Sequence, residues 1–151
     1  MTRNIPLDAE KIKNLAIDTE NCLKELSTLG AMDLSVFKSD RHNYGLADHF
    51  LRRTLENILT IGTHILSRLP VKTKDYQEVI TSLGKNNIIP SEFADKNKKL
   101  AGYRNRLVHM YWEVSEEELH QVINTHLLDL QKFLEYYEAV LKNPKKFNLP
   151  E

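Results

Sequence analysis

Hydrophobic residues recur every three or four positions along much of the chain, the spacing that places them on one face of an α-helix. The first such stretch predicts a helix over Leu7–Gly30, with Asp8 as its cap and the glycine ending it. A second and longer helix is expected over Asp40–Leu69 or Leu46–Leu69, because Pro70 stops the pattern.

One glycine interrupts the hydrophobic face of this second helix. Gly62 falls in register with the residues expected to be buried. A glycine inside a helix costs about 1 kcal/mol of helix propensity relative to alanine. Its position therefore predicts that a neighbouring helix approaches closely at this point.

Three more helices are expected in the remainder of the chain. A short one covers Lys74–Leu83 and ends at Gly84, and a fourth continues to Val108 with Ser91 as its N-cap. The last begins at the capping-box sequence S-E-E-E over Ser115–Glu118 and continues to Leu141. No run of alternating strand residues is found, so we predict an all-α, up-and-down bundle of four to five helices. A single domain spans residues 1–151.

The composition narrows the kind of protein without naming a function. Lysines and arginines balance aspartates and glutamates at 21 each, so any attraction to nucleic acid must come from a local patch. Cys22 is the only cysteine, which excludes an intrachain disulfide, and its place on a hydrophobic face suggests packing. The N-terminus lacks the apolar core of a signal peptide, and no apolar run approaches ~20 residues. A cytoplasmic protein without a membrane partner is expected.

The segment before the last helix concentrates positive charge. Five lysines and arginines and no acidic residue occur over 96–109, with three aromatic residues in or just beyond this stretch. Positive charge interleaved with aromatic rings suits phosphate contact and base stacking. We expect RNA contacts from Lys98, Lys99, Arg106 and Tyr103, although Tyr103 could equally pack inside the protein. Trp112 is expected in the core or at an interface rather than as a platform for a base.

Helical geometry relates three polar residues of this segment. Asn105 and His109 are four apart, hence on one face, where the amide could hold the imidazole. Arg104 lies five positions before His109, about 140° around a regular helix. The two could converge through the long arginine side chain, or because the helix ends near His109 and the chain turns back, which would also bring Tyr111 close.

Arginine and histidine at one phosphate suffice for RNA cleavage without a metal. An imidazole titrates near neutral pH and can take the proton of a 2′-hydroxyl or return one to the leaving oxygen. A guanidinium can stabilise the charge that builds on the phosphoryl oxygens. Arg104, His109 and Asn105 are therefore the candidate catalytic residues, and a 2′,3′-cyclic phosphate is the expected product.

The run from Gly102 to Val114 closely resembles the signature of the HepT-like HEPN family, R-x-x-x-x-H-x-Y. Arg104, Asn105, the pair Leu107-Val108, His109 and Tyr111 each match it. The resemblance extends from about residue 44 to residue 137 and is weaker over the first forty residues.

This resemblance implies an endoribonuclease toxin that uses neither metal nor cofactor. It also implies a homodimer whose two motifs face one cleft. The expected partners are an RNA substrate and an antitoxin, a minimal nucleotidyltransferase that transfers AMP onto Tyr111. The added anion would then block an approaching RNA phosphate.

Other interpretations of the same residues remain open. The chain could be a non-catalytic helical partner of a nucleotidyltransferase, or a degenerate relative with a structural role. The other five histidines lack metal-ligand spacing and are expected to be exposed or to make bundle contacts: His42, His49, His64, His120 and His126. Asp48 could face the motif across the bundle, but a solvated position is favoured.

Overall fold

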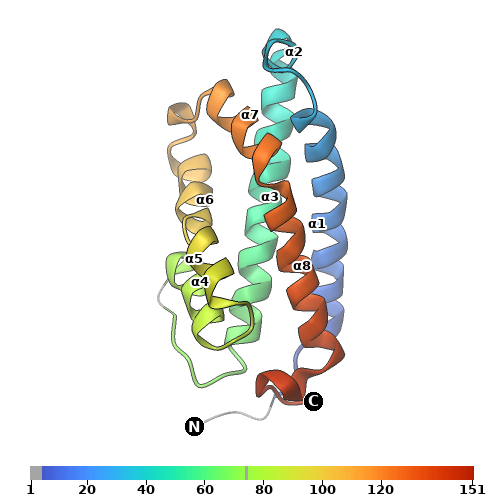
Figure 1. Ribbon diagram of the computed structural model, residues 1–151, viewed down its shortest axis with the longest axis vertical. Helices are drawn as coiled ribbons and strands as arrows, with labels where there is room; N and C mark the ends of the chain where they lie inside the picture. Colours follow the sequence, from blue (N-terminus) through green and yellow to red (C-terminus); the bar gives the residue numbers. More distant parts are fainter. Residues whose placement is uncertain (1–4, 74) are drawn as a thin grey trace.

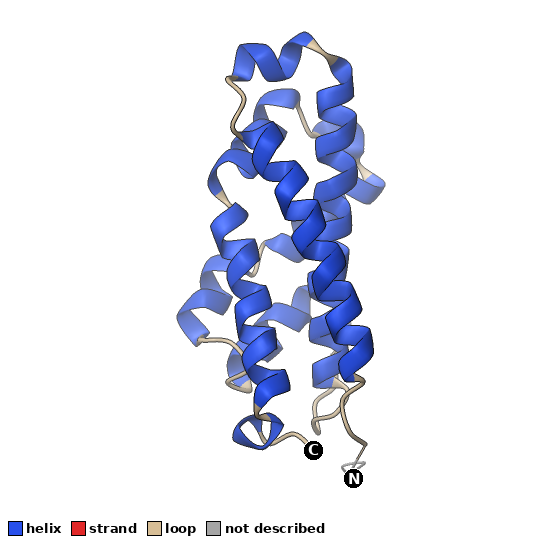
Figure 2. Cartoon of the chain, turned by 90° about the vertical axis from the view of Figure 1, so that its right-hand side faces the viewer, coloured by secondary structure: helices blue, strands red, loops and turns tan. Residues whose placement is uncertain are grey.

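The computed structural model describes residues 5–73 and 75–151. These residues form eight α-helices and two short 3-10 helices, and they contain no strand (Figure 2). The elements are α1 (Ala9–Gly30), α2 (Leu34–Ser39), α3 (Arg41–Leu66), α4 (Tyr76–Lys85), α5 (Ser91–Asn97), α6 (Leu100–His109), η1 (Tyr111–Glu113), α7 (Glu116–Thr125), α8 (Leu127–Lys142) and η2 (Pro144–Phe147).

The longest helix, α3, forms the centre of the bundle. It contacts α1, α2, α4, α6, α7 and α8. In Figure 1, α1 and α8 lie on one side of α3, and α4, α5 and α6 lie on the other. The predicted all-α bundle is confirmed, and the candidate motif on α6 lies on the side of α3 away from α1.

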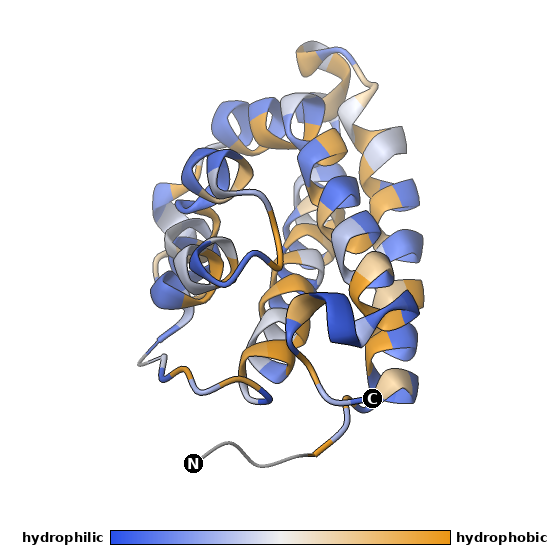
Figure 3. Ribbon diagram, turned by 60° about the horizontal axis from the view of Figure 1, so that its bottom comes forward, coloured by the Kyte–Doolittle hydropathy of each residue, from blue (hydrophilic) through white to orange (hydrophobic). Residues whose placement is uncertain are grey.

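Hydrophobic side chains from every long helix meet in one core. Hydrophobic and hydrophilic residues alternate around the helices (Figure 3), as the periodic sequence pattern requires. Cys22 belongs to the buried residues and is 3% exposed, so its predicted packing role is confirmed. No helix in the described part of the chain is long and apolar enough to cross a membrane.

Three of the five glycines lie where another helix comes close: Gly30, Gly62 and Gly84. A Cβ atom placed on Gly62 would lie 2.9 Å from side-chain carbons of Val79 and Leu83 in α4, which confirms the predicted close approach. Gly30 is different from expectation, because it is the last residue of α1 and its φ is not positive. Its Cβ would lie 2.4 Å from the carbonyl oxygen of Ile123, so this glycine admits α7. Gly84 likewise lies inside α4 and does not end it.

Two predicted helices are each broken into two. The fourth divides into α5 and α6 at Lys98-Lys99, and the last divides into α7 and α8 at His126. Just before each break, a side chain donates to the carbonyl four residues earlier: the Asn97 amide to Phe93 and the Thr125 hydroxyl to Gln121. Such bonds compete with the helical pattern and bend helices.

Helix starts follow the predicted caps in most places. The Asp8 carboxylate accepts from the Lys11 N–H at 3.0 Å, and the Ser115 hydroxyl accepts from the Glu118 N–H at 3.1 Å. Ser91 is not a cap but the first residue of α5, preceded by Pro90. The predicted start at Lys74 lies outside the described residues, and Asp75 caps α4.

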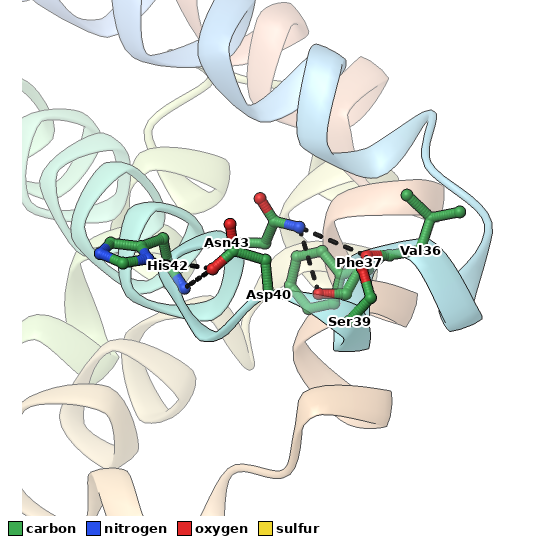
Figure 4. Close-up of polar contacts among 6 residues, drawn as sticks. All are labelled: Val36, Phe37, Ser39, Asp40, His42 and Asn43. Atoms are coloured by element: carbon green, nitrogen blue, oxygen red, sulfur yellow. Dashed lines mark hydrogen bonds and ion pairs between the residues drawn. The ribbon is translucent and has the colours of Figure 1, made fainter.

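A compact polar junction links α2 to α3 (Figure 4). The Asp40 carboxylate accepts from the backbone N–H of His42 at 2.9 Å and thereby caps α3. The amide of Asn43 donates to the carbonyls of Val36 and Phe37, at 3.4 and 3.3 Å. Since the Phe37 ring is buried, these bonds fix the short α2 against the end of the bundle.

Candidate active site

The helix that carries the motif ends where the chemistry needs a turn. His109 is the last residue of α6, and Met110 leaves the helix with φ −138° and ψ 42°. Its N–H still donates to the Arg106 carbonyl at 2.8 Å, and the chain then folds into η1. The predicted turn near His109 is confirmed, and it leaves the imidazole exposed at a helix end.

A tyrosine of α3, Tyr44, fixes the backbone of the turn after α6. The Tyr44 hydroxyl donates to the Val114 carbonyl at 2.6 Å and lies 3.5 Å from the Tyr111 carbonyl. Burial raises the pKa of Tyr44 above its usual range, which keeps this hydroxyl protonated as a donor. The backbone of η1 is therefore fixed although its side chains are not.

Two aromatic rings project from η1 into solvent. Tyr111 is 60% exposed and Trp112 is 69% exposed, and the rings meet edge to face with centroids 5.5 Å apart. Of the two places expected for Trp112, the core is wrong and an interface stays a prediction. Its ring remains available for an interface or for stacking on a base.

Arg104 contrasts with these free rings, because three helices position it. Its Nε donates to Glu56 of α3 at 2.7 Å, and its Nη1 donates to the Asn105 side chain at 3.0 Å. Its guanidinium lies 5.1 Å from the ring centroid of Tyr76 of α4. The Tyr76 hydroxyl donates to the second Glu56 oxygen at 3.1 Å, closing the cluster. The Arg104 side chain is 19% exposed.

Asn105 has a different partner from the one expected. We predicted that its amide would hold His109, but its side-chain oxygen accepts from Arg104. Among the described residues no hydrogen bond joins Asn105 or Arg104 to His109. Within α6 the five-residue spacing places Arg104 and His109 about 140° apart around the helix, and the turn that follows leaves the histidine exposed.

The positive segment is less positive than its sequence indicates. Acidic side chains from other helices neutralise three of its five cations: Arg104 pairs with Glu56, Arg106 with Glu118, and Lys96 with Asp129. The Arg106 pair is bidentate, with N–O distances of 2.6 and 3.1 Å. Lys98 and Lys99, at the break before α6, are exposed, and neither pairs with an acidic side chain among the described residues.

Tyr103 lies between the two roles considered for it. Its ring is partly buried and packs on the core, with the Arg106 guanidinium 5.8 Å from its centroid. Burial raises the pKa of its phenol well above the usual range. RNA contacts by Tyr103 and Arg106 stay predictions, and neither side chain is free to move without breaking packing or an ion pair.

Two of the other five histidines bond the backbone of another element, and the other three are exposed, as expected. His64 accepts from the Asp8 N–H at 3.0 Å, and His120 contacts the Met32 carbonyl at 2.6 Å. No group of three or more histidines, cysteines, aspartates or glutamates among the described residues could hold a metal ion. Asp48 is not solvated as expected: its side chain is 20% exposed and pairs with Arg52 at 3.2 Å.

Glu56 and Tyr76 were missed by the sequence reasoning. They lie 48 and 28 positions before Arg104, on other helices, so no local spacing connects them to the motif. One available indication was Glu56, an acidic residue beside the buried face of the longest helix, which could pair with the segment over 96–109 that has no acidic residue of its own.

Comparison with known proteins extends this picture. The family model described as ribonuclease HepT-like matches residues 19–137. The mRNA nuclease HepT of Shewanella oneidensis is 30% identical over 135 residues, which are 85% of this chain and 96% of that protein.

Solved structures agree with the sequence comparison. The tri-AMPylated Shewanella oneidensis HEPN toxin in complex with MNT antitoxin superposes with a TM-score of 0.76 and 28% identity, covering 85% of this chain and 97% of that one. The cytosolic protein YutE of Bacillus subtilis, at 20% identity, 91% and 93% coverage and a TM-score of 0.74, shares the fold. The predicted fold class and the predicted enzyme class, a ribonuclease, are confirmed. With a helical bundle of this shape, a complete arginine–histidine–tyrosine motif at the end of α6, and a family model covering most of its length, the chain belongs to the HepT-like ribonuclease family.

Proposed function

We propose that the chain is the RNA-cleaving toxin of a toxin–antitoxin pair, with Arg104 and His109 at the reacting phosphate. The observation that carries this proposal is the fixed guanidinium of Arg104. Its Nε and Nη1 are engaged by Glu56 and Asn105. Within the described residues its Nη2 makes no hydrogen bond, so this edge can donate to a phosphoryl oxygen.

The reaction needs one proton removed and one proton supplied. His109 accepts the proton of the 2′-hydroxyl, the 2′ oxygen attacks phosphorus, and the bond from phosphorus to the 5′ oxygen breaks. The leaving oxygen takes a proton, giving a 2′,3′-cyclic phosphate and a 5′-hydroxyl. A second copy of the chain, with its own Arg104 and His109 beside the same cleft, supplies the second imidazole, which protonates the leaving oxygen. The assembly is therefore a homodimer with a shared cleft.

Cleavage that needs no metal and depends on His109 tests the catalytic proposal. We expect RNA cleavage to survive an excess of chelator and to fall roughly 10²–10⁴-fold in His109→Ala. His126→Ala, which removes another exposed histidine, serves as the matched control. Loss of activity with chelator, or full activity of His109→Ala, would contradict the proposal. Tight complex formation without any cleavage would favour the non-catalytic alternative.

Tyr111 is the proposed site of regulation by a nucleotidyltransferase antitoxin. The related toxin structure is tri-AMPylated and bound to its antitoxin. In this chain the 60% exposure of Tyr111 lets its phenol oxygen attack the α-phosphorus of ATP, with pyrophosphate leaving and the phenol proton passing to solvent. The attached AMP places negative charge beside the RNA phosphate site.

The modification has its own test. Incubation with the nucleotidyltransferase and ATP is expected to add AMP to the wild type and to Tyr136→Phe, but not to Tyr111→Phe. We expect Tyr111→Phe to keep its cleavage activity and to escape inhibition. AMP found on Tyr111→Phe in the same amount as on the wild type would refute the assignment.

A further inference from the structure

A hollow of about 340 Å³ lies between α4 and α6, beside the candidate active site. Its lining residues are Gln77, Thr81, Lys98, Lys99 and Gly102, which we call the α4–α6 groove. The lining carries two ammonium groups, an amide and a hydroxyl, but no acidic side chain. This chemistry differs from the hydrophobic contacts elsewhere between the helices.

The two lysines of the groove are the unneutralised cations of the positive segment. Lys96, Arg104 and Arg106 each have an acidic partner from another helix. Among the described residues neither Lys98 nor Lys99 has one. Consecutive residues of an unbroken helix point about 100° apart, but the break between α5 and α6 lets both lysines line one hollow. The charge left over is therefore directed into the groove.

Gly102 keeps the groove open at a cost to the helix. Its φ is not positive, and a Cβ there would meet nothing within 4 Å, so neither backbone conformation nor helix packing requires a glycine. Gly45 is equally open, so openness alone proves nothing. Gly102 differs from the packed glycines, Gly62 and Gly84, because it forms part of the wall of a hollow. A glycine there costs about 1 kcal/mol relative to alanine, which is explained if a ligand occupies the space.

The groove borders the arginine of the motif on two sides. Gly102 precedes Arg104 by two residues on α6, and Gln77 follows Tyr76, whose ring lies 5.1 Å from the Arg104 guanidinium. From Lys98 to Arg104 the rise along a helix would be about 9 Å at 1.5 Å per residue. A nucleic-acid backbone whose phosphate reaches Arg104 therefore passes the lysines.

We propose that the α4–α6 groove binds the nucleotide next to the scissile phosphate of single-stranded RNA. Lys98 and Lys99 contact its phosphate, and the Gln77 amide and Thr81 hydroxyl hydrogen-bond its ribose or base. This inference rests on the proposed ribonuclease function and assigns the substrate a direction along α6. The absence of acids in the groove and the open wall at Gly102 both favour this occupant.

Binding of a labelled single-stranded oligouridylate to the full-length His109→Ala protein tests the groove independently of cleavage. Adding Lys98→Ala/Lys99→Ala should lower the slope of log affinity against log salt by about 0.7, the contribution of the one phosphate of a single strand that both lysines contact. The pair Lys24→Ala/Lys132→Ala removes the same charge from exposed positions on α1 and α8. An equal loss in both pairs would mean diffuse attraction and would overturn the proposal.

Substitutions at Gly102 distinguish a loss of binding caused by filling the groove from a loss caused by misfolding. Gly102→Glu should weaken oligouridylate binding roughly tenfold, because its carboxylate enters the groove and repels phosphate. Gly102→Ala should melt at a higher temperature and weaken binding less than Gly102→Glu does, because its methyl group takes part of the space left by the glycine. Unchanged binding by Gly102→Glu, with the fold confirmed by circular dichroism, would overturn the proposal.

Cleavage by the corresponding variants with His109 intact distinguishes the two hypotheses. The groove variants should raise KM for long RNA more than KM for a dinucleotide, since a dinucleotide holds only the scissile phosphate and lacks the phosphate assigned to the lysines. If the wild type cleaves nothing while the groove variants still change binding, the ribonuclease proposal fails and the groove stands. If the wild type cleaves and the groove variants match their controls in binding, the groove proposal fails alone.

Discussion

The two ends of the motif segment are held in opposite ways. At one end, Arg104 is 19% exposed and contacts side chains from α3, α4 and its own helix. At the other, Tyr111 is 60% exposed, and only the backbone around it is fixed, through Tyr44. A group that stabilises a transition state acts best when its position is set in advance. A side chain that another enzyme modifies must instead reach solvent.

This difference predicts where substitutions act on rate and where they act on access. Changes around Arg104 should lower the rate of the chemical step without altering how the end of the segment is presented. Changes around Tyr44 should loosen the segment with a smaller effect on the fixed arginine.

Removing the fixed guanidinium should have the largest effect. Arg104→Lys cannot keep the bonds to both Glu56 and Asn105 while facing a phosphate, so we expect cleavage to fall roughly 10²–10³-fold. Single-turnover cleavage measures it. Arg106→Lys is the matched control, on the same helix and also paired with a glutamate. A fall of equal size in that control would mean that the loss of cleavage is not specific to Arg104.

The next effect comes from Glu56, a positioning residue. Glu56→Gln keeps an acceptor for Arg104 but removes the charge-assisted part of the bond, so we expect kcat to fall by about tenfold with KM unchanged. Tyr76→Phe keeps the aromatic ring beside the Arg104 guanidinium, so we expect a smaller fall in kcat for this variant. A rise in KM with constant kcat would instead identify Glu56 as part of RNA binding. Double variants with Arg104→Lys should be non-additive.

Loosening the exposed end should cost less. Tyr44→Phe leaves the buried Val114 carbonyl without its 2.6 Å donor, and we expect a loss of about 1–2 kcal/mol in unfolding free energy. Hydrogen exchange should quicken around η1 and stay unchanged around Arg104. Faster exchange at both ends would show that the segment moves as one piece.

The ion pair between Asp18 and Arg53, which lies outside the motif, should contribute least to stability, and its contribution should depend on pH. Hydrogen bonding to Arg53 lowers the pKa of Asp18, so the carboxylate stabilises the fold above its ordinary pKa and loses this contribution as pH falls through the lowered value. Asp18→Asn should lower stability by about 0.2–1 kcal/mol at neutral pH, and the difference should vanish in acid. Urea unfolding at both pH values measures it. A difference that persists in acid would assign the effect to packing.

Helix positions could be predicted because they depend on local pattern and caps. The hydrophobic spacing and the caps at Asp8 and Ser115 located the long helices correctly. The breaks at Lys98-Lys99 and His126 could not be predicted, since neither contains proline or glycine. A side chain bonds a carbonyl one turn earlier just before each break, as Asn97 does, but threonines inside the unbroken α1 and α3 make the same bond, so this bond alone does not set a break.

The motif could be recognised from sequence, but its electrostatics could not. Counting charges over 96–109 gave a strongly positive patch, because the acids that neutralise it come from α3, α7 and α8. Asn105 was paired with His109 on helical spacing alone, yet a neighbouring guanidinium offers a charged donor, the stronger bond. Partners that are distant in sequence decide these choices.

Glu118 links two helices through one residue. Its backbone N–H is capped by Ser115 at the start of α7, and its carboxylate grips both Arg106 nitrogens on α6. The bidentate pair between Glu118 and Arg106 forms only when α6 and α7 are both folded and packed against each other. A local fluctuation that releases α7 therefore removes the acidic partner of Arg106 and leaves its guanidinium free on α6, while Arg104 keeps its contacts with Glu56 and Tyr76.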